Sequence, residues 1–419
     1  MELTTFSNRY LKLTLFCLLV SFIANGQEFW TMDQFLLNSF QSPVQQYQEE
    51  KITLLAEGNY RLPVIENLQF RTETRDFDLE KQDYDLRLNT NSFRSINAQE
   101  KINNTDYSIH KIHQSILLKN ELSNRYNILL SLIFKRDQLT LVRQKLEIYQ
   151  DKLTVLKSMS SWNLTKIKEL IKVETEILEA DIQKLNLESS LLNLNNRIAG
   201  MCGKEIHIVT EDLIAARFVR EHFDDVVLSD SVAGKQLNLA KLKLQKNENT
   251  QHLLKNENRK LVKFYQLGYR DSDQPFEQSQ LSLGIGFNLP FKGSDKLKEA
   301  KLEFENIELH SDIEIEMDDL RQEQYEIITR LENNILEYET LQRHFNNSLA
   351  NKTLVKYKEI PEISALSILY LKEYNIAQNE QLMRAEFNLY RDYIESLEIF
   401  DLLDNSPFQN FLSINHLGY

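Results

Sequence analysis

Few residues of this 419-residue chain stand in arrangements that could bind a metal or catalyse a reaction. His110 and His113 are three residues apart on an expected helix, but no nearby cysteine or carboxylate pattern completes a tetrahedral metal site. The acidic run from Glu314 to Asp319 lacks the glycine turn and loop spacing of a calcium site, so we interpret it as one exposed stripe of a long helix. Phosphate-binding loops, serine-hydrolase elbows and zinc-protease motifs are absent from the sequence. The sequence therefore predicts a protein that is not an enzyme and that uses no cofactor.

The N-terminus has the pattern of a secretory protein. Arg9 and Lys12 precede an apolar run and the small residues Ala24-Asn25-Gly26, which predicts a signal peptide over residues 1–26. After its removal Cys202 is the remaining cysteine, so no intramolecular disulfide is expected. No later run is apolar and long enough for a transmembrane helix. The net charge of −13 argues against nucleic acid as a partner, because phosphates would be repelled.

The second half of the chain repeats the first half at an offset of 199 residues, as in 285 − 86 = 199. A strand-like alternation recurs: Leu68, Phe70, Leu86 and Leu88 return as Leu267, Tyr269, Ile285 and Phe287. A helical stripe recurs too: Leu170, Ile177, Leu191 and Ile198 return as Leu369, Ile376, Tyr390 and Leu397. We interpret the mature chain as two copies of one unit, residues 27–228 and 229–419, each opening with a helix, with a connecting segment at 205–228 and a C-terminal tail.

Long stretches without glycine or proline predict unusually long helices. Residues 96–158 form such a stretch, which as a helix would reach about 90 Å. A polar break at 158–163 and a second helical pattern over 165–198 indicate a helical hairpin over 96–198. The second copy predicts a helix over 294–351, a break near Pro361, and a returning helix over 364–403 that Pro361 helps to start, which gives a second hairpin over 294–403.

Four strands of about nine to eleven residues are expected between these helices, the length that a tilted transmembrane strand requires. They are predicted at 62–72, 84–93, 261–269 and 281–289. Each alternates an apolar face with a polar or small face, as a barrel wall between lipid and water does. The residues expected to face lipid are Leu68, Phe70, Leu86, Leu88, Leu267, Tyr269, Leu283, Ile285 and Phe287. The alternative is a soluble two-faced sheet packed on helices.

A sheet that spans a membrane must close, because lipid offers no partner to backbone groups. Four strands are too few for this, since the smallest filled barrels use about eight. If these strands cross a membrane, several chains must share one barrel.

The passage from strand to helix through Leu289-Pro290-Phe291-Lys292-Gly293 resembles that of the TolC-like outer-membrane efflux proteins. The segment from Tyr357 to Ile376 is similar as well, where Ile363-Ser364 precedes Leu366 and Leu369, and Leu164-Thr165 with Ile167 and Leu170 echoes it in the first copy. The resemblance covers the mature chain in the order of its elements: helix, strand pair, helical hairpin, then the same again.

This resemblance implies a fold class that is mainly α with membrane β. Three identical chains would form a homotrimer, with a β-barrel in the lipid of the outer membrane of a Gram-negative bacterium and an α-helical barrel in the periplasm. It also implies an exit duct of an efflux or secretion system whose partners are a periplasmic adaptor protein and an inner-membrane transporter. At the helix tips the chain departs from the family, because Ile360-Pro361 stands where the family usually has glycine.

The tips of the two hairpins are the expected functional positions. Symmetry would bring charged side chains of one tip into a ring, so we expect a pore constriction there. Its candidate residues are Lys166, Lys168, Glu169 and Ser367. Trp162 is an aromatic residue at a tip, and with Ile360 and Pro361 it is the candidate for partner docking. A plain charged helix end remains the alternative for the constriction.

Two functions from different classes follow from the sequence. The first is a passive conduit, whose transport energy must come from a partner because no nucleotide-binding motif is present. The second is a periplasmic coiled-coil scaffold or binding protein whose strands form a soluble sheet. Four strands that each keep one apolar face favour the conduit, because a scaffold would tolerate polar breaks on that face.

Overall fold

The computed structural model describes residues 28–58, 60–74, 82–159, 164–209, 213–221, 234–270, 280–287, 294–356 and 363–413. Residues 1–41, 119–230 and 324–419 form one compact unit, which we call unit 1, and residues 42–118 and 231–323 form unit 2. Each unit takes segments from both halves of the chain. The compact units thus differ from the repeats 27–228 and 229–419, which stay a prediction, and the signal peptide 1–26 lies outside the described residues.

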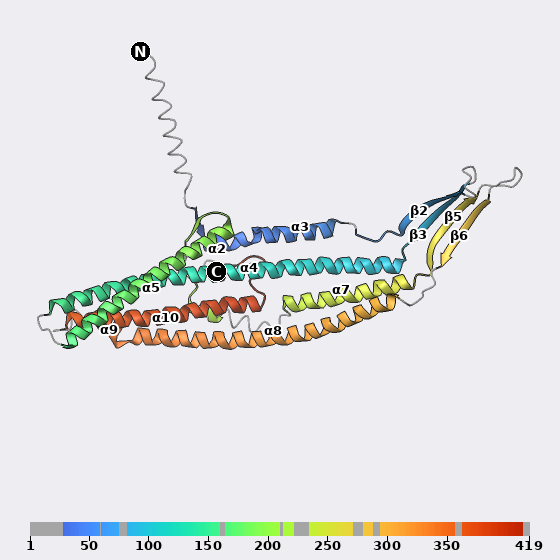
Figure 1. Cartoon of the computed structure of the whole chain (residues 1–419). Coiled ribbons are helices and arrows are strands. Elements are labelled where there is room, and N and C mark those ends of the chain that lie inside the picture. Colours follow the sequence, from blue (N-terminus) through green and yellow to red (C-terminus); the bar gives the residue numbers. More distant parts are fainter. Residues whose placement is uncertain are drawn as a thin grey trace, which may run out of the picture. The chain divides into compact units, whose positions relative to one another are not determined.

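The described chain is mostly helical, with long helices and a few strands, as the sequence predicts (Figure 1). In chain order its elements are β1 (Glu28–Thr31), α2 (Met32–Leu37), η1 (Asn38–Gln41), α3 (Pro43–Glu57), β2 (Ile65–Thr74), β3 (Gln82–Thr90), α4 (Phe93–Ser158), α5 (Leu164–Cys202), β4 (Ile206–Val209), α7 (Lys235–Asn258), β5 (Val262–Arg270), β6 (Gln280–Phe287), α8 (Ser294–Asn347), α9 (Leu349–Lys356) and α10 (Ala365–Ile399).

The first predicted hairpin matches α4 and α5. Helix α4 runs from Phe93 to Ser158 without a break, because no glycine or proline interrupts it. Ser92 caps the start of this helix, because its hydroxyl accepts a hydrogen bond from the backbone N–H of Ser95 at 3.1 Å. Helix α5 begins at Leu164 and continues to Cys202, four residues beyond the predicted end at Ile198, since 202 − 198 = 4.

The long helix predicted over 294–351 is interrupted, which corrects that prediction. Helix α8 ends at Asn347, and α9 starts at Leu349. The side chain of Asn351 explains the break, because its amide donates to the Phe345 carbonyl at 2.9 Å and its oxygen accepts from Asn375 at 2.5 Å. An asparagine that bonds to nearby backbone in this way competes with the helical pattern.

The returning helix α10 is shorter than the predicted 364–403. It begins after Ser364, whose hydroxyl accepts from the backbone N–H of Ser367 at 3.1 Å as an N-cap. The helix therefore starts at Ala365, and Pro361, which was expected to help to start it, lies outside the described residues. At the other end Asp401 has a φ of 57° in the left-handed region, which ends the helix, and its carboxylate lies 2.9 Å from the Lys119 ammonium.

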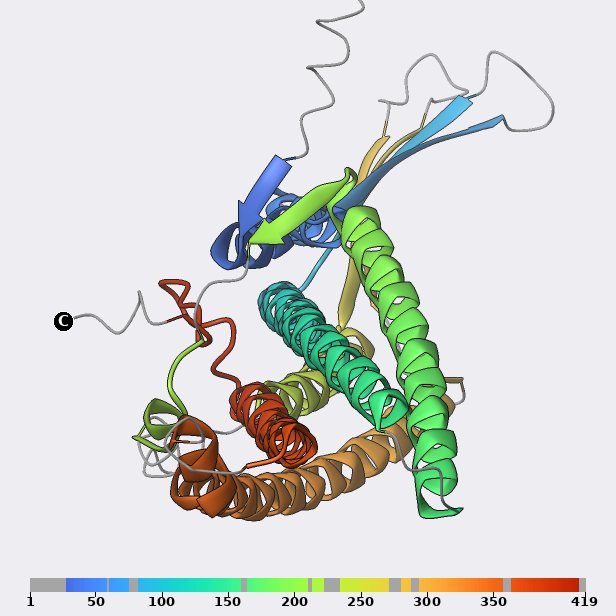
Figure 2. The ribbon, with the colours of Figure 1, turned by 90° about the vertical axis from the view of Figure 1, so that its left-hand side faces the viewer.

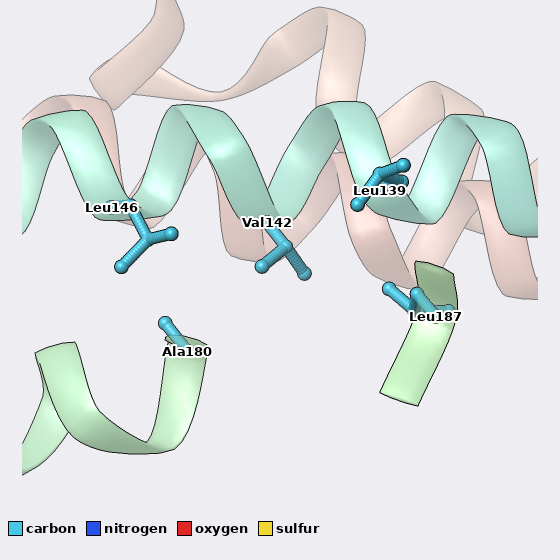
Figure 3. Packing of buried hydrophobic residues seen from close by; sticks show 5 residues of the cluster. All are labelled: Leu139, Val142, Leu146, Ala180 and Leu187. Carbon is cyan, nitrogen blue, oxygen red and sulfur yellow. The ribbon is translucent and has the colours of Figure 1, made fainter. Parts of the chain in front are cut away.

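Helix α4 is the centre of unit 1 and lies between α5 and α10 (Figure 2). Toward α5 it presents Leu139, Val142 and Leu146, which pack against Ala180 and Leu187 (Figure 3). Residue numbers on α4 rise as those on α5 fall, so the two helices are antiparallel.

A different stripe of α4 faces α10. It consists of Leu141 and Ile148, which pack with Leu369 and Ile376. Residues three and seven positions apart lie on the same side of a helix, so Leu139, Val142 and Leu146 form one stripe. Leu141 and Ile148 form the other stripe on a different side. One helix thereby supports two antiparallel neighbours.

A buried arginine fastens the N-terminal segment to α4. Arg125, which is fully buried, donates to the Phe35 carbonyl at 2.6 Å and to Asn38 at 3.2 Å, and pairs with Glu121 at 2.9 Å. Its guanidinium also lies 4.9 Å from the Phe35 ring centre. These bonds fix α2 and η1 on unit 1.

The sequence did not predict strands β1 and β4. They pair in parallel as a separate sheet, with Glu28 opposite Ile206 and Thr31 opposite Val209. Four residues are too few to display a period-two pattern, which is why β4 was read only as part of the connecting segment 205–228.

Unit 2 contains the sheet β2-β3-β5-β6, and its helices are joined to one another by polar contacts. Lys246 on α7 lies 2.7 Å from Asp106 on α4. Asn247, also on α7, is buried and donates to the Leu302 carbonyl and to Asn306 on α8, each at 3.0 Å. A buried amide with two fixed partners specifies how α7 and α8 are aligned.

We expect Leu187→Ala to destabilise unit 1 by about 2–4 kcal/mol, because it leaves a cavity where α5 packs on α4. The measurement is chemical unfolding of the purified protein followed by circular dichroism. Glu179→Ala, on an exposed position of the same helix, is the control and should leave the midpoint almost unchanged. Equal midpoints for the two variants would contradict this packing.

Candidate functional site

The four strands of unit 2 form one antiparallel sheet in which the apolar residues line up in rows. The strand order is β2-β3-β5-β6. One row is Phe70, Leu86, Leu267 and Leu283; the next is Leu68, Leu88, Tyr265 and Ile285; a third is Thr72, Tyr84, Tyr269 and Leu281. Side chains in such rows share one face, since directly paired residues point the same way.

This apolar face is exposed in the described chain. Leu283 is 90% exposed and Phe70 is 66% exposed, while Leu86 and Leu88 on the inner strand β3 are half-buried by their neighbours. Tyr84 lies between Phe70 and Tyr269, with ring centres 6.0 Å and 6.3 Å away. A contiguous apolar face of this kind marks a surface that contacts lipid or another protein.

The predicted strand limits differ from the observed ones by up to three residues at either end. Strand β2 begins at Ile65 instead of residue 62, because Pro63 offers no N–H to the ladder. Strand β3 spans 82–90 instead of 84–93, and Asn91 instead bonds to the Val64 and Pro63 carbonyls. The nine residues proposed to face lipid all lie within β2, β3, β5 and β6.

The opposite face carries polar and small side chains. Its rows are Arg71, Asp85, Gly268 and Ser282, then Gln69, Arg87, Gln266 and Gly284. Arg87 donates to Gln266 at 3.3 Å and its guanidinium lies 4.0 Å from the Phe264 ring centre. A β-carbon at Gly286 would come within 2.2 Å of that ring, so glycine is required there to seat Phe264.

The structure places the four constriction candidates differently from one another. Lys166 is buried and donates from Nζ to the Met159 carbonyl at 2.5 Å, just past the end of α4, while Lys168 is exposed. Ser367 is exposed and its backbone N–H takes part in the cap of α10. Glu169 accepts a hydrogen bond from the Tyr370 hydroxyl. The docking candidates Trp162, Ile360 and Pro361 lie outside the described residues.

A group of polar side chains, most of which the sequence did not single out, joins helices α4, α5 and α10. The Lys152 ammonium on α4 pairs with Glu373 on α10 and lies 4.1 Å from the Tyr370 ring centre. The hydrogen bond to Glu169, together with burial, raises the pKa of Tyr370 to about 12. Farther along the same two helices, Lys145 contacts Glu380 at 2.5 Å. The signal was the spacing of seven between the two lysines and between the two glutamates.

Helix α5 carries a second apolar stripe that points away from α4. Its members are Leu164, Ile171, Leu178, Leu185 and Leu192, all exposed and spaced by sevens. A stripe with this spacing normally packs against another helix. Within the described residues of unit 1, no helix covers it.

The described residues hold no group of three or more histidine, cysteine or acidic side chains that could bind a metal. His110 and His113 lie on α4, and Asp318 of the acidic run pairs with Arg321 at 3.5 Å on the surface of α8.

Burial raises the pKa of the Cys202 thiol, which keeps it protonated. Among the helices described, none combines the length and apolar character needed to cross a membrane.

No protein-family model matches the chain, and no curated protein matches it. Solved structures do match, over 88% of the chain. The open state of the MtrE outer membrane channel of Neisseria gonorrhoeae has a TM-score of 0.61 at 10% identity and is covered to 86%. The outer-membrane channel OprN has a TM-score of 0.64 at 11% identity and is covered to 89%. The outer membrane protein VceC of Vibrio cholerae has a TM-score of 0.60 at 10% identity and is covered to 96%.

The chain thus has the fold of outer-membrane channels, and at the level of the fold the resemblance to TolC-like proteins is confirmed. At identities near 10% the likeness concerns the fold alone. The site must be argued from the residues of this chain.

The two partners of the buried ion pair are not equally exposed, and this predicts unequal effects of mutation. The Lys152 side chain is 1% exposed, whereas that of Glu373 is 27% exposed. Glu373→Gln should cost about 2–4 kcal/mol of stability because it leaves a buried ammonium without its counter-ion, while Lys152→Met should cost about 1 kcal/mol because water reaches the remaining carboxylate. Chemical unfolding of both variants checks this, and a larger loss for Lys152→Met would contradict it.

Proposed function

We propose that the chain is the outer-membrane channel of a trans-envelope efflux or secretion system, a passive conduit that carries out no catalysis. The observation that carries this proposal is the four-stranded sheet in which three rows of mostly apolar side chains share one face that is largely exposed. The shared fold with outer-membrane channels supports it.

The strands have the dimensions of membrane-spanning strands. Strands β2, β3 and β5 have 10, 9 and 9 residues and the described part of β6 has 8, against about 9–11 for a tilted transmembrane strand. Eight of the nine proposed lipid-facing residues belong to the apolar rows, and the ninth, Phe287, is exposed on the outermost strand β6. The polar face, with Arg71, Asp85 and Arg87, would then line water.

The edges of the sheet call for strands from further copies of the chain, and we propose that the assembly is a homotrimer. Strands β2 and β6 lie at the two ends of the order β2-β3-β5-β6, so each has one side without a strand partner in the described chain. In lipid these backbone groups must pair with another strand. Three copies, each with four strands, would close a barrel of about twelve strands, which is within the range known for such barrels.

The exposed stripe of α5 fits the same assembly. Ile171, Leu178 and Leu185 are large apolar side chains, and such residues are costly to leave in water along a whole helix. We propose that a helix of the neighbouring copy covers them, which would build a helical barrel in the periplasm.

The tips of the helices are the proposed contact with the rest of the system. Because no nucleotide-binding motif is present, energy would come from an inner-membrane transporter joined through a periplasmic adaptor. Trp162, Ile360 and Pro361 remain the proposed docking residues. Of the constriction candidates, Lys168 is exposed and Glu169 is held by Tyr370, which favours these two over the buried Lys166.

The second candidate function is a periplasmic scaffold with a soluble sheet. It would leave the apolar rows that contain Leu283 and Phe70 in water unless a partner covers them. The deciding experiment is fractionation of cells followed by mass determination in detergent. A trimer in the outer membrane, with the first 26 residues removed, supports the channel, whereas a soluble single copy would refute it.

A charge on the apolar face should prevent membrane assembly. We expect Leu283→Lys to abolish recovery in the outer membrane, because a lysine facing the middle of the bilayer costs about 2–4 kcal/mol per copy. The adjacent Ser282→Lys is the control, since Ser282 faces the polar side near Asp85 and the new ammonium gains a carboxylate neighbour. Outer-membrane yield of both variants is the measurement, and equal recovery would contradict the assigned facing.

The stripe on α5 can be tested separately from the strands. We expect Leu178→Asp combined with Leu185→Asp to reduce the trimer fraction in detergent, because the new carboxylates would face the neighbouring helix across each interface. Asn186→Asp with Asn193→Asp adds the same charge at exposed positions beside the stripe and should leave the trimer intact. If both double variants stay trimeric by native mass measurement, the stripe is not the subunit contact.

A further inference from the structure

Unit 1 contains a groove of about 730 Å³ that none of the proposed channel functions uses. Its walls come from α4 near Phe134, the segment 213–217, α8 near Tyr338 and α10 near Glu386. This volume lies within the range of about 300–1,000 Å³ that is usual for small-molecule sites.

The walls of the groove are largely apolar and aromatic. Phe134 and Phe387 stack with ring centres 4.3 Å apart and planes at 19°. Ile133, Ile335 and Leu389 continue this lining. Such walls favour a ligand with an aromatic or branched apolar group.

The carboxyl group of Glu386 lacks a strong hydrogen-bond donor. The hydroxyl of Tyr390 donates its single proton to the Ile214 carbonyl. The Tyr390 hydroxyl oxygen also lies 3.4 Å from Oε1 of Glu386. With its own proton donated to Ile214, this oxygen can form a strong hydrogen bond with Glu386 only if the Glu386 carboxyl group is protonated and donates. Burial and the nearby charge of Asp137 raise the pKa of Glu386.

The cations around the groove contact groups other than Glu386 and Asp137. Arg136, beside Asp137, donates to the Ile208 carbonyl at 3.1 Å, and Arg220 pairs with Glu339 at 2.8 Å. Arg217 lies against the Phe218 ring, 4.8 Å from its centre. Among the described residues, no ion pair joins a lysine or arginine to Glu386 or Asp137. The groove thus presents two carboxyl groups that are not in salt bridges.

We propose that this groove binds an organic ammonium ion that carries an aromatic or branched apolar group, with Glu386 as its principal counter-ion and Asp137 as the second. The ammonium supplies the donors that Glu386 lacks, and a charge-assisted bond in a partly dry site is stronger than a neutral one. The apolar group packs on Phe134 and Phe387, and the cation can also lie over the Tyr338 ring. This inference does not depend on the channel function.

The test is titration calorimetry of the full-length protein in neutral detergent with phenethylamine, against a blank of detergent alone. We expect saturable binding of phenethylamine and none of its neutral isostere 2-phenylethanol at the same concentrations. Glu386→Gln should weaken phenethylamine binding by about tenfold or more, because one charge-assisted bond is lost. Glu337→Gln removes the same charge from an exposed position of α8 outside the groove and should leave the affinity unchanged.

The pH dependence gives a second readout that a purely apolar pocket would not show. The titratable and charged groups at the groove are Arg136 and Asp137 on α4, Arg217 on the segment 213–217, Tyr338 and Glu339 on α8, and Glu386 and Tyr390 on α10. Because the pKa of Glu386 is raised, its charged fraction grows as pH rises through that pKa, while the amine stays protonated. Affinity should therefore rise as the pH is raised above the range in which an ordinary glutamate titrates, and it should rise less in Glu386→Gln.

Three results would overturn the proposal. They are no saturable binding of phenethylamine, equal binding of 2-phenylethanol, or an unchanged affinity in Glu386→Gln. The first of these results counts against the proposal even if a neighbouring copy of the chain fills the groove. Each can occur whether or not the protein is a trimer in the outer membrane, so failure here is distinct from failure of the channel proposal.

Discussion

The hydrogen-bonding of the outer strands β2 and β6 is the constraint on which the rest of the structure depends. Both lie at the ends of the order β2-β3-β5-β6, beside a face whose apolar rows are exposed. If lipid covers that face, as we propose, it leaves the edge groups of β2 and β6 unpaired, so other strands must pair with them. The proposed assembly of several identical chains would supply these strands, and it would also cover the exposed stripe on α5.

Helix α4 meets its two neighbours in chemically different ways. Against α5 it packs apolar side chains such as Val142 and Leu187, and the ion pair between Arg143 and Glu188 at this contact is exposed. Against α10 the apolar contact is accompanied by Lys145 with Glu380 and Lys152 with Glu373. Ion pairs at a spacing of seven fix the register of two antiparallel helices, since a shift would leave the buried Lys152 ammonium unpaired.

Long regular elements could be predicted from the sequence because their periodicity extends over many residues. Helices α4 and α5 and the four strands of unit 2 lie close to their predicted ranges. The short strands β1 and β4 were missed, and so was the break at Ser348, because it depends on how Asn351 bonds to Phe345 and Asn375. A side chain that competes locally with a helix leaves no periodic signal.

The sequence by itself determined which side chains alternate along each strand and which recur by sevens along each helix, because both periods are properties of the local backbone. Only the tertiary structure decided which residues meet. It brought Phe70, Leu86, Leu267 and Leu283 into one row, placed Lys166 against the end of α4, and gathered Asp137 and Glu386 at one groove. Most of these partners are far apart in the chain, and the distance between them is set by packing, which no local pattern records.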